Sequence, residues 1–269
     1  MLFASWGSLL IVALLELARE RRPLARSPLR RWASNLTLGW LNRWTVGWLV
    51  PVGAFAAAHW AEAGGVGLLN LFELPTSLVA LSTIVLLDLA AWAEHRLSHA
   101  LPWLWRLHRV HHADPDLDFS TTHRHHPVAA AFTGGVRAGA AVCIGATPVG
   151  VLLYYLLRGP VDAFAHGNIR LPAGFERALR GIVVTPDFHA VHHSAARRET
   201  DANFSALFSW WDLWFGTGCA EPKGGVAGMA LGLEGFRESR DLDLDRLLWQ
   251  PFRSEGVSGD EKACAQAGE

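Results

Sequence analysis

Cysteine is scarce in this chain: its 269 residues include only Cys143, Cys219 and Cys264. The three lie far apart and form no C-x-x-C pair, which argues against a disulfide framework and against a cysteine-bound zinc or iron–sulfur site. Charge is also in short supply, because 18% of the residues are charged against about 25% in an average soluble domain. With a net charge of −1, the chain lacks the basic excess typical of nucleic-acid-binding proteins, so no nucleic-acid partner is expected.

Apolar and aromatic residues are correspondingly abundant. Hydrophobic residues make up 51% of the chain, and thirteen residues are tryptophan, which is enriched where membranes meet water. No glycine-, serine- or proline-rich linker divides the sequence. We therefore expect one membrane-embedded domain over residues 1–253, followed by a polar, disordered tail over residues 254–269.

Four apolar stretches predict the membrane organisation. They are residues 2–18, a span within residues 36–60, residues 76–93 and residues 128–165. About 20 apolar residues cross a bilayer, so the last stretch is long enough for two helices, joined by a turn at residues 146–148. No basic residue precedes the first stretch, which is therefore expected to be a retained helix and not a signal peptide.

Arginine placement predicts the orientation of these spans. A run of arginines follows the first stretch, and such residues mark the cytoplasmic side. Counting crossings from there places the twelve histidines between residues 95 and 193 on the cytoplasmic side. Arg137 and Arg158 fall inside the last stretch, where a charge is costly unless it faces protein or a polar cavity.

Histidine carries the chemical signal. Three clusters have spacings that put their rings on one helix face: His95-x-x-x-His99, His108-x-x-His111-His112 and His189-x-x-His192-His193. A fourth cluster is HRHHP, residues 123–127, which contains His126, and His166 stands alone between the clusters. His123 and His125 are expected to be solvated neighbours of His126, and His59 to be a hydrogen-bonded structural residue.

So many imidazoles indicate two metal ions. Imidazole binds zinc, iron, copper and nickel, and eight or more rings exceed what one ion can hold. Two adjacent metals fit the activation of dioxygen, which requires several electrons. Each ligand ring also needs an acceptor for its other nitrogen, and the sequence offers several candidates: Asp88, Glu94, Asp114, Asn168, Asp187 and Asp201.

Two other functions remain alternatives. A zinc-dependent hydrolase would carry H-E-x-x-H with its general base, a motif that the sequence lacks. A metal transporter would place its ligands near the middle of the membrane, whereas these histidines are expected just beyond one face. Imidazole itself does not distinguish iron from zinc.

The sequence resembles the fatty acid hydroxylase / sterol desaturase superfamily. The matching stretches are DLAAWAEHRLSH, HRVHH, RHHP, HGNIRLP and TPDFHAVHH, followed by DANFSALFSWWDLWFGT. The resemblance covers roughly residues 80–250, with a histidine-box core at residues 80–217. One departure is Trp92-Ala93, where the family commonly has an aromatic pair, and this change could alter the substrate channel.

The resemblance implies an all-α fold, in which polytopic membrane helices carry a cytosolic helical cap with a histidine-bound di-metal centre. It implies two non-haem iron ions, with O2 as co-substrate, that hydroxylate or desaturate a C–H bond of a lipid such as a sterol, fatty acyl chain or carotenoid. A separate ferredoxin or cytochrome would supply electrons. Ten histidines match the family's metal-binding positions: His95, His99, His108, His111, His112, His126, His166, His189, His192 and His193. The acceptors expected beside them are Asp88, Asn168, Asp187 and Asp201.

Overall fold

A computed structural model describes residues 2–24, 28–222 and 224–254 of the chain. Every regular element in these ranges is a helix, and the only β-type pairings there are two isolated bridges, Glu20 with Ile169 and Ser194 with Leu231. The all-α prediction is therefore confirmed for the described part of the chain. The expected tail lies outside the described residues except for Ser254.

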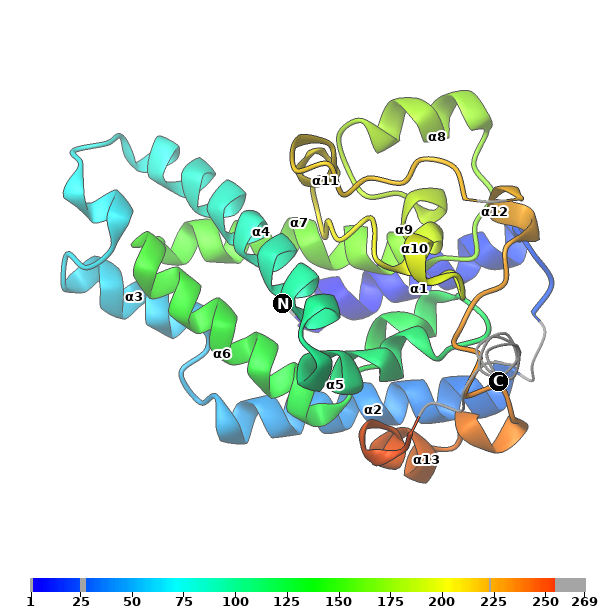
Figure 1. The fold of residues 1–269 in the computed structure, drawn as a ribbon. Coiled ribbons are helices and arrows are strands. Elements are labelled where there is room, and N and C mark those ends of the chain that lie inside the picture. The colour runs from blue at the N-terminus through cyan, green and yellow to red at the C-terminus, as the bar shows by residue number, and fades with distance from the viewer. Residues whose placement is uncertain (1, 25–27, 223, 255–269) are drawn as a thin grey trace, which may run out of the picture.

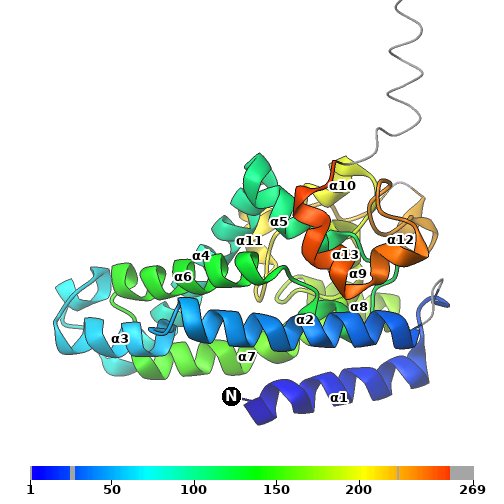
Figure 2. The same ribbon diagram turned by 90° about the horizontal axis from the view of Figure 1, so that it is seen from below.

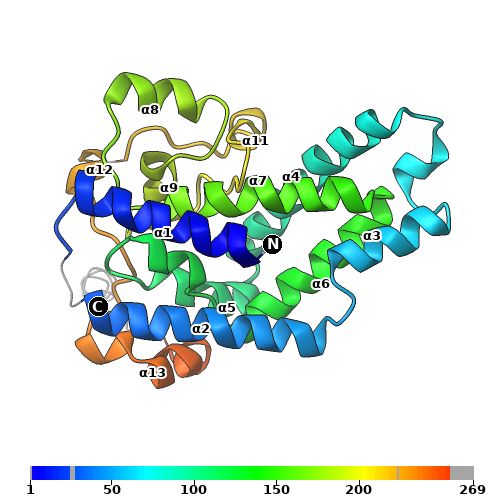
Figure 3. The same ribbon diagram turned by 180° about the vertical axis from the view of Figure 1, so that it is seen from behind.

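Long helices form one part of the molecule (Figure 1). Their bounds are α1 (Leu2–Arg19), α2 (Pro28–Leu49), α3 (Ala54–Ala63), α4 (Thr76–Ala100), α6 (Pro127–Ile144) and α7 (Pro148–His166), with the short η1 (Leu68–Leu71) between α3 and α4. Helix α4 packs on α6 and α7, α2 and α3 pack on α6, and α1 packs on α7. Figure 3 shows α1, α2, α6 and α7 from the opposite side to Figure 1.

Shorter helices cover one side of this layer. They are α5 (Pro102–His112), η2 (Phe119–His123), α8 (Ala173–Arg180), α9 (Pro186–His192), α10 (Arg197–Thr200), α11 (Trp210–Trp214), α12 (Gly225–Gly228), η3 (Ser239–Leu242), α13 (Leu244–Trp249) and η4 (Gln250–Phe252). Figure 2 shows α5, α10 and α13 on one side of the long helices and α1 on the opposite side. The molecule thus has a layer of long helices with a group of shorter helices on one side, which are together called the cap.

The turn expected between the last two helices is confirmed. Helix α6 ends at Gly145, which takes the left-handed conformation (φ 70°, ψ 43°) that glycine adopts without strain. Thr147 then caps α7 by accepting a hydrogen bond from the Gly150 amide at 3.1 Å, and Pro148 occupies the first turn. The residues between the two helices therefore determine both the end of α6 and the start of α7.

The stretch within residues 36–60 is divided, contrary to the expectation of one span. Helix α2 ends at Leu49 and α3 begins at Ala54. Pro51 explains the break, because proline lacks an amide hydrogen and disfavours a helical conformation in the residue before it. Among the described residues, α4 and α6 are the two helices long and apolar enough to cross a membrane.

Helix α2 has an apolar outer face and a polar inner face. Its exposed side chains include Trp40, Trp44 and Trp48, at four-residue spacing, whereas Arg31 and Asn35 are buried. This arrangement is opposite to that of a helix on the surface of a water-soluble protein. An outer face of this kind is suited to contact with lipid.

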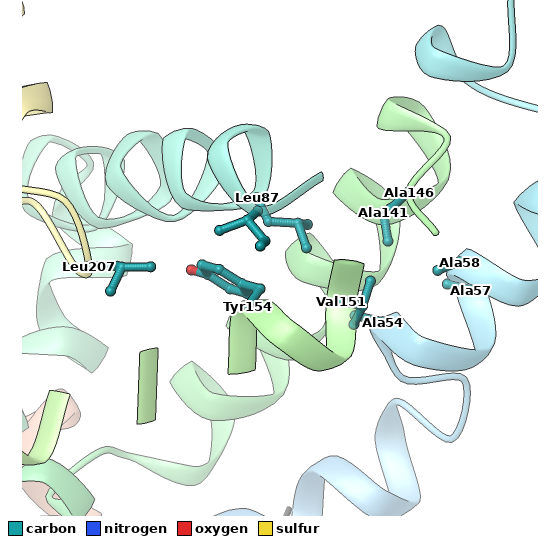
Figure 4. Packing of buried hydrophobic residues seen from close by; sticks show 10 residues of the cluster. Ala54, Ala57, Ala58, Leu87, Ala141, Ala146, Val151, Tyr154 and Leu207 are labelled. Atoms are coloured by element: carbon teal, nitrogen blue, oxygen red, sulfur yellow. The ribbon is translucent and has the colours of Figure 1, made fainter. Parts of the chain in front are cut away.

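Small residues bring the long helices close together. Figure 4 shows Val151 of α7 beside Ala54 of α3, and Tyr154 of α7 near Leu87 of α4. Between α4 and α7, a β-carbon added at Gly150 would lie 2.6 Å from that of Thr83. This close contact fixes α4 against α7, and both helices carry histidines at their far ends.

Candidate metal centre

Nine histidines form two adjacent groups beneath the cap. The first consists of His95, His99, His108, His112 and His192, and the second of His111, His166, His189 and His193. Within each group, one nitrogen from every ring lies within 4.8 Å of the others. Nine of the ten predicted ligands therefore lie together.

The H-x-x-H-H spacing divides each of its clusters between the two groups. On α5, His108 and His112 belong to the first group and His111 to the second. At α9, His192 belongs to the first group and His189 to the second, together with His193 at the helix end. Helices α5 and α9 thus each contribute to both groups.

The converging atoms are the Nε2 nitrogens. In the first group, His95 Nε2 lies 3.0 Å from those of His108 and His192, and His112 Nε2 lies 3.1 Å from those of His99 and His108. In the second group the corresponding separations are 3.1 Å for His111–His166, 3.0 Å for His166–His189 and 3.2 Å for His189–His193. Imidazole nitrogens about 2.1 Å from an ion lie about 3.0 Å apart at right angles and about 3.4 Å apart in a tetrahedron. The observed separations are of the size expected for ligands that share one ion.

The other ring nitrogens show that these contacts are not ordinary hydrogen bonds. His95 Nδ1 lies 2.8 Å from the Phe204 carbonyl oxygen, and His192 Nδ1 lies 2.7 Å from that of Ala202. A carbonyl oxygen only accepts, so both Nδ1 atoms carry the hydrogen and a neutral ring has none on Nε2. Two nitrogen lone pairs therefore face each other at 3.0 Å, an arrangement that a shared cation would stabilise.

Burial keeps the rings neutral. Desolvation, and then the proximity of other histidines, lowers the pKa of His111, His112 and His193 well below 6.5. The pKa values of His189 and His192 are lowered in the same direction by burial. Neutral imidazole is the form that binds metal, so the residues present fit two metal ions.

Only one of the four predicted acceptors reaches a histidine. Asp201 accepts from His99 Nδ1 at 3.1 Å. Asp187 instead pairs with Arg21 at 2.6 Å, and Asn168 bonds the backbone of Arg22.

The fourth predicted acceptor, Asp88, organises the loop that carries the carbonyl acceptors. It accepts from Trp211 Nε1 at 2.9 Å and from the Phe208 amide at 3.0 Å. Asp212 accepts from the amides of Phe204 and Ser205 at 3.0 and 2.8 Å. The two carboxylates hold this loop so that its carbonyl oxygens face the histidine rings.

Four rings have an outer nitrogen that is buried without a protein acceptor. The Nδ1 atoms of His111, His112, His189 and His193 are buried and make no hydrogen bond within the described ranges. His166 differs from these, because its Nδ1 donates to the Asp162 carbonyl oxygen at 2.8 Å. The carbonyl contacts of His95, His166 and His192 were not predicted, because a backbone oxygen has no residue-type signature.

The remaining histidines differ from expectation. His126 lies apart from both groups: its Nδ1 accepts from the Val128 amide at 3.2 Å, which caps α6, and its Nε2 contacts the Leu248 carbonyl oxygen at 3.2 Å. His125 is not a solvated neighbour, because its ring stacks on His111 at 4.3 Å and burial lowers its pKa to about 3. His59 is exposed on α3 and forms no hydrogen bond to any described residue.

A buried ion network secures the loop after α5. The Arg31 guanidinium contacts Asp114 at 2.7 Å and Asp118 at 2.8 Å, and all three side chains are almost fully buried. Burial alone would raise the pKa of Asp114, but the charges of Arg31 and Arg124 outweigh it and lower the pKa to about 2. The network ties α2 to the segment that follows the His111-His112 pair.

A cavity of about 760 Å³ adjoins both histidine groups. Its walls include His95 and His108 of the first group and His111, His166 and His189 of the second, together with apolar and charged residues of α2, α6 and α7. Its size falls within the range of about 300–1,000 Å³ that is usual for small-molecule sites. The arrangement can hold an elongated molecule against the histidine centre.

Comparisons with known proteins agree with this geometry. The family model described as fatty acid hydroxylase matches residues 80–217. The chain is 30% identical over 144 residues to ornithine lipid hydroxylase OlsE of Rhizobium tropici, which covers 52% of this chain and 41% of that protein. It is 24% identical over 172 residues to alkylglycerol monooxygenase of Xenopus tropicalis, and the alignment covers 63% of this chain and 37% of that protein. It is 26% identical over 136 residues to a cholesterol 25-hydroxylase-like protein of Danio rerio, and the alignment covers 50% of this chain and 53% of that protein. The aligned parts span about half or less of these relatives. No solved structure matches the chain.

Proposed function

The chain belongs to the fatty acid hydroxylase family, and we propose that it uses O2 to hydroxylate or desaturate a C–H bond of a lipid at a histidine-bound di-iron centre. The observation that carries this proposal is the contact between the Nε2 atoms of His95 and His192, which lie 3.0 Å apart with their lone pairs facing each other. The same all-nitrogen environment is repeated in the second group. Neither group contains a carboxylate.

Nine histidines would hold the two ions. His95, His99, His108, His112 and His192 would bind one, and His111, His166, His189 and His193 the other. Two bound irons supply the redox capacity that O2 activation requires. The protein's part is to keep the rings neutral and correctly oriented through Asp201 and the carbonyl oxygens of Phe204, Ala202 and Asp162.

The stoichiometry requires an electron donor. Hydroxylation consumes one O2, two electrons and two protons, and it yields one alcohol group and one water. Removal of a second hydrogen in place of oxygen insertion would yield an alkene. We propose that a separate ferredoxin or cytochrome docks on the cap and delivers the electrons.

The substrate is proposed to be a lipid that reaches the cavity from the bilayer. The relatives' names refer to an ornithine lipid, an alkylglycerol and cholesterol, which share a large apolar body and differ in their polar groups. The exposed tryptophans of α2 and the apolar helices α4 and α6 support membrane embedding. We propose a multi-pass protein with its histidine centre facing the cytoplasm.

Metal analysis of protein purified without oxygen tests this function. We expect about two irons per chain by elemental analysis and a di-iron signal by Mössbauer spectroscopy of an iron-57 sample. His111→Ala and His192→Ala should each lose iron, whereas the exposed His59→Ala should not. Stable zinc with no iron, after iron-replete expression and attempted reconstitution, would falsify the oxygenase proposal and favour a hydrolase or transporter.

A further inference from the structure

Arg137 makes no direct polar contact with the described part of the protein. It lies in the middle of α6, a helix apolar enough to cross a membrane, where a charged group is costly unless it is paired or faces a polar cavity. Its side chain lines the cavity that adjoins the histidines, and its Nε is buried. Arg137 forms no hydrogen bond or ion pair with any described residue. The cavity therefore presents a guanidinium group whose hydrogen-bond donors are not used by any described residue.

Two further hydrogen-bond donors lie on α7 in the same cavity wall. Tyr155 lines the cavity, and its hydroxyl makes no hydrogen bond in the described part of the chain. Arg158 also lines it and uses one nitrogen to donate to the Tyr154 hydroxyl at 3.2 Å. Arg137 is close enough to Tyr154 and Asp162 to interact electrostatically with both. The donors of α6 and α7 thus lie in one region.

The nearby carboxylates are already engaged. Asp162 faces His166, with its Oδ1 3.6 Å from Nδ1, and it interacts electrostatically with both arginines. Glu94 accepts from Thr133 at 2.9 Å and from Ser98 at 3.2 Å.

The remaining acid near Arg158, Asp88, accepts from Trp211 and Phe208 and does not line the cavity. Among the charged residues that line the cavity, the arginines outnumber the acids: Arg43, Arg137 and Arg158 against Glu94 and Asp162.

We propose that Arg137, together with Tyr155 and Arg158, binds an anionic oxygen group, a carboxylate or a phosphate, at the polar end of the lipid substrate. This inference rests on the proposed function and specifies its substrate class. The guanidinium fork matches carboxylate and phosphate geometry. A neutral hydroxyl could accept a hydrogen bond from Arg137 but would leave the excess of arginines over acids in the cavity wall unchanged.

The same anchor determines which part of the substrate reaches the histidines. Arg158 precedes His166 by eight residues on α7, a rise of about 12 Å between their backbone positions at about 1.5 Å per residue. Its guanidinium is close enough to His95 and His166 to interact electrostatically with both. A lipid held by its polar end beside Arg158 therefore has a fixed stretch of its chain against the histidine centre.

Equilibrium binding to the iron-loaded protein in amphipol tests the anchor without requiring turnover. The probes are radiolabelled palmitate, hexadecanol and hexadecyl phosphate, which have the same chain and different polar ends. We expect wild-type protein to bind palmitate and hexadecyl phosphate about tenfold or more tightly than hexadecanol. Arg137→Gln should remove most of this preference and leave hexadecanol binding unchanged, whereas Arg137→Lys should retain part of it. Arg177→Gln, an exposed residue on α8, is the matched control.

Equal affinity for palmitate and hexadecanol in the wild type would overturn the inference, as would an unchanged preference in Arg137→Gln. Displacement of palmitate by inorganic phosphate, without binding of hexadecyl phosphate, would assign the site to a free anion and also overturn it.

Iron content checks the fold of each variant. If Arg137→Gln does not fold, Tyr155→Phe must weaken palmitate binding selectively for the inference to stand. Selective palmitate binding without any oxidation would retain the anchor and reject the oxygenase proposal.

Discussion

Several of the histidines are oriented by the acceptor that their outer nitrogen contacts. The Asp201 carboxylate accepts from His99 and also pairs with Arg197 at 2.7 Å, so its position is fixed from the cap surface. Carbonyl oxygens have the same role for His95 and His192. Removal of one such acceptor leaves the ligand ring in place but free to rotate.

Asp201→Ala should therefore weaken iron binding by about 10- to 100-fold, the usual cost of losing a partner of this kind. Asp201→Asn should weaken it less, because the amide oxygen can still accept from His99. Chelator competition measures both affinities, and Asp245→Asn, an exposed acid, serves as the control. Equal affinities of Asp201→Ala and the wild type would show that Asp201 does not orient His99.

Acid should destabilise the metal-free protein because it protonates histidines that are buried as neutral rings in the folded state. Burial lowers the pKa of His111, His112, His189 and His193 below the value of about 6.5 that they have when unfolded. The unfolded chain therefore takes up protons first, and stability falls as pH drops below about 6.5.

Thermal unfolding measured between about pH 7.5 and pH 5.5 should show a falling midpoint for metal-free protein. Iron-loaded protein should resist this fall until protons displace the metal. A midpoint independent of pH in the metal-free protein would mean that the rings are not held neutral.

The sequence predicted which histidines lie together better than it predicted their supports. Histidine spacing identified eight of the nine rings that the structure brings together, because i, i+3 and i+4 positions share a helix face, and the family resemblance identified the ninth, His166. His126 matched a family motif, but it occupies the N-cap position of α6, because Pro127 is the first residue of that helix. The supporting carbonyl oxygens could not be predicted, because their positions depend on the tertiary path of residues 201–217.

At the scale of helices, the order of the elements followed from local signals, but their tertiary contacts did not. Gly145, Thr147 and Pro148 encode the α6–α7 turn in adjacent residues. The polar inner face of α2 has no comparable signature. Arg31 meets Asp114 and Asp118 only after the chain has folded, across more than eighty residues of sequence.

Arg31→Met tests how strongly this network holds α2 to the loop after α5. The substitution leaves two buried carboxylates without their cation, at an expected cost of about 3–5 kcal/mol. Arg30→Gln removes a pair with Asp243 at the protein surface, so it should cost far less stability. Denaturant unfolding of the two variants measures the contrast, and similar stabilities would contradict a structural role for the buried network.

At the scale of the whole molecule, the cap and the α6–α7 turn lie at opposite ends of the long helices. Cys143 lies near the turn and is exposed, while Cys219 is partly buried in the cap. About 25 Å separates the two ends of α6 at about 1.5 Å per residue. This separation is sufficient to place the two cysteines on opposite sides of a membrane.

A membrane-impermeant maleimide tests the proposed orientation in a Cys264→Ser background. We expect Cys143 to be labelled in intact cells and Cys219 only after the cells are opened. Cys143→Ser and Cys219→Ser assign the labelled bands. Labelling of Cys219 in intact cells would reverse the orientation, and labelling of both would contradict a hairpin that crosses the membrane.

The division of α5 and α9 between the two groups has a consequence for metal loading. Binding of the first ion would fix both helices and thereby preorganise the second set of ligands, so the second ion pays less ordering entropy. Loading should then be positively cooperative. Native mass spectrometry at half-saturating iron should detect mainly empty and doubly loaded chains, whereas abundant singly loaded chains would show that the two sites fill independently.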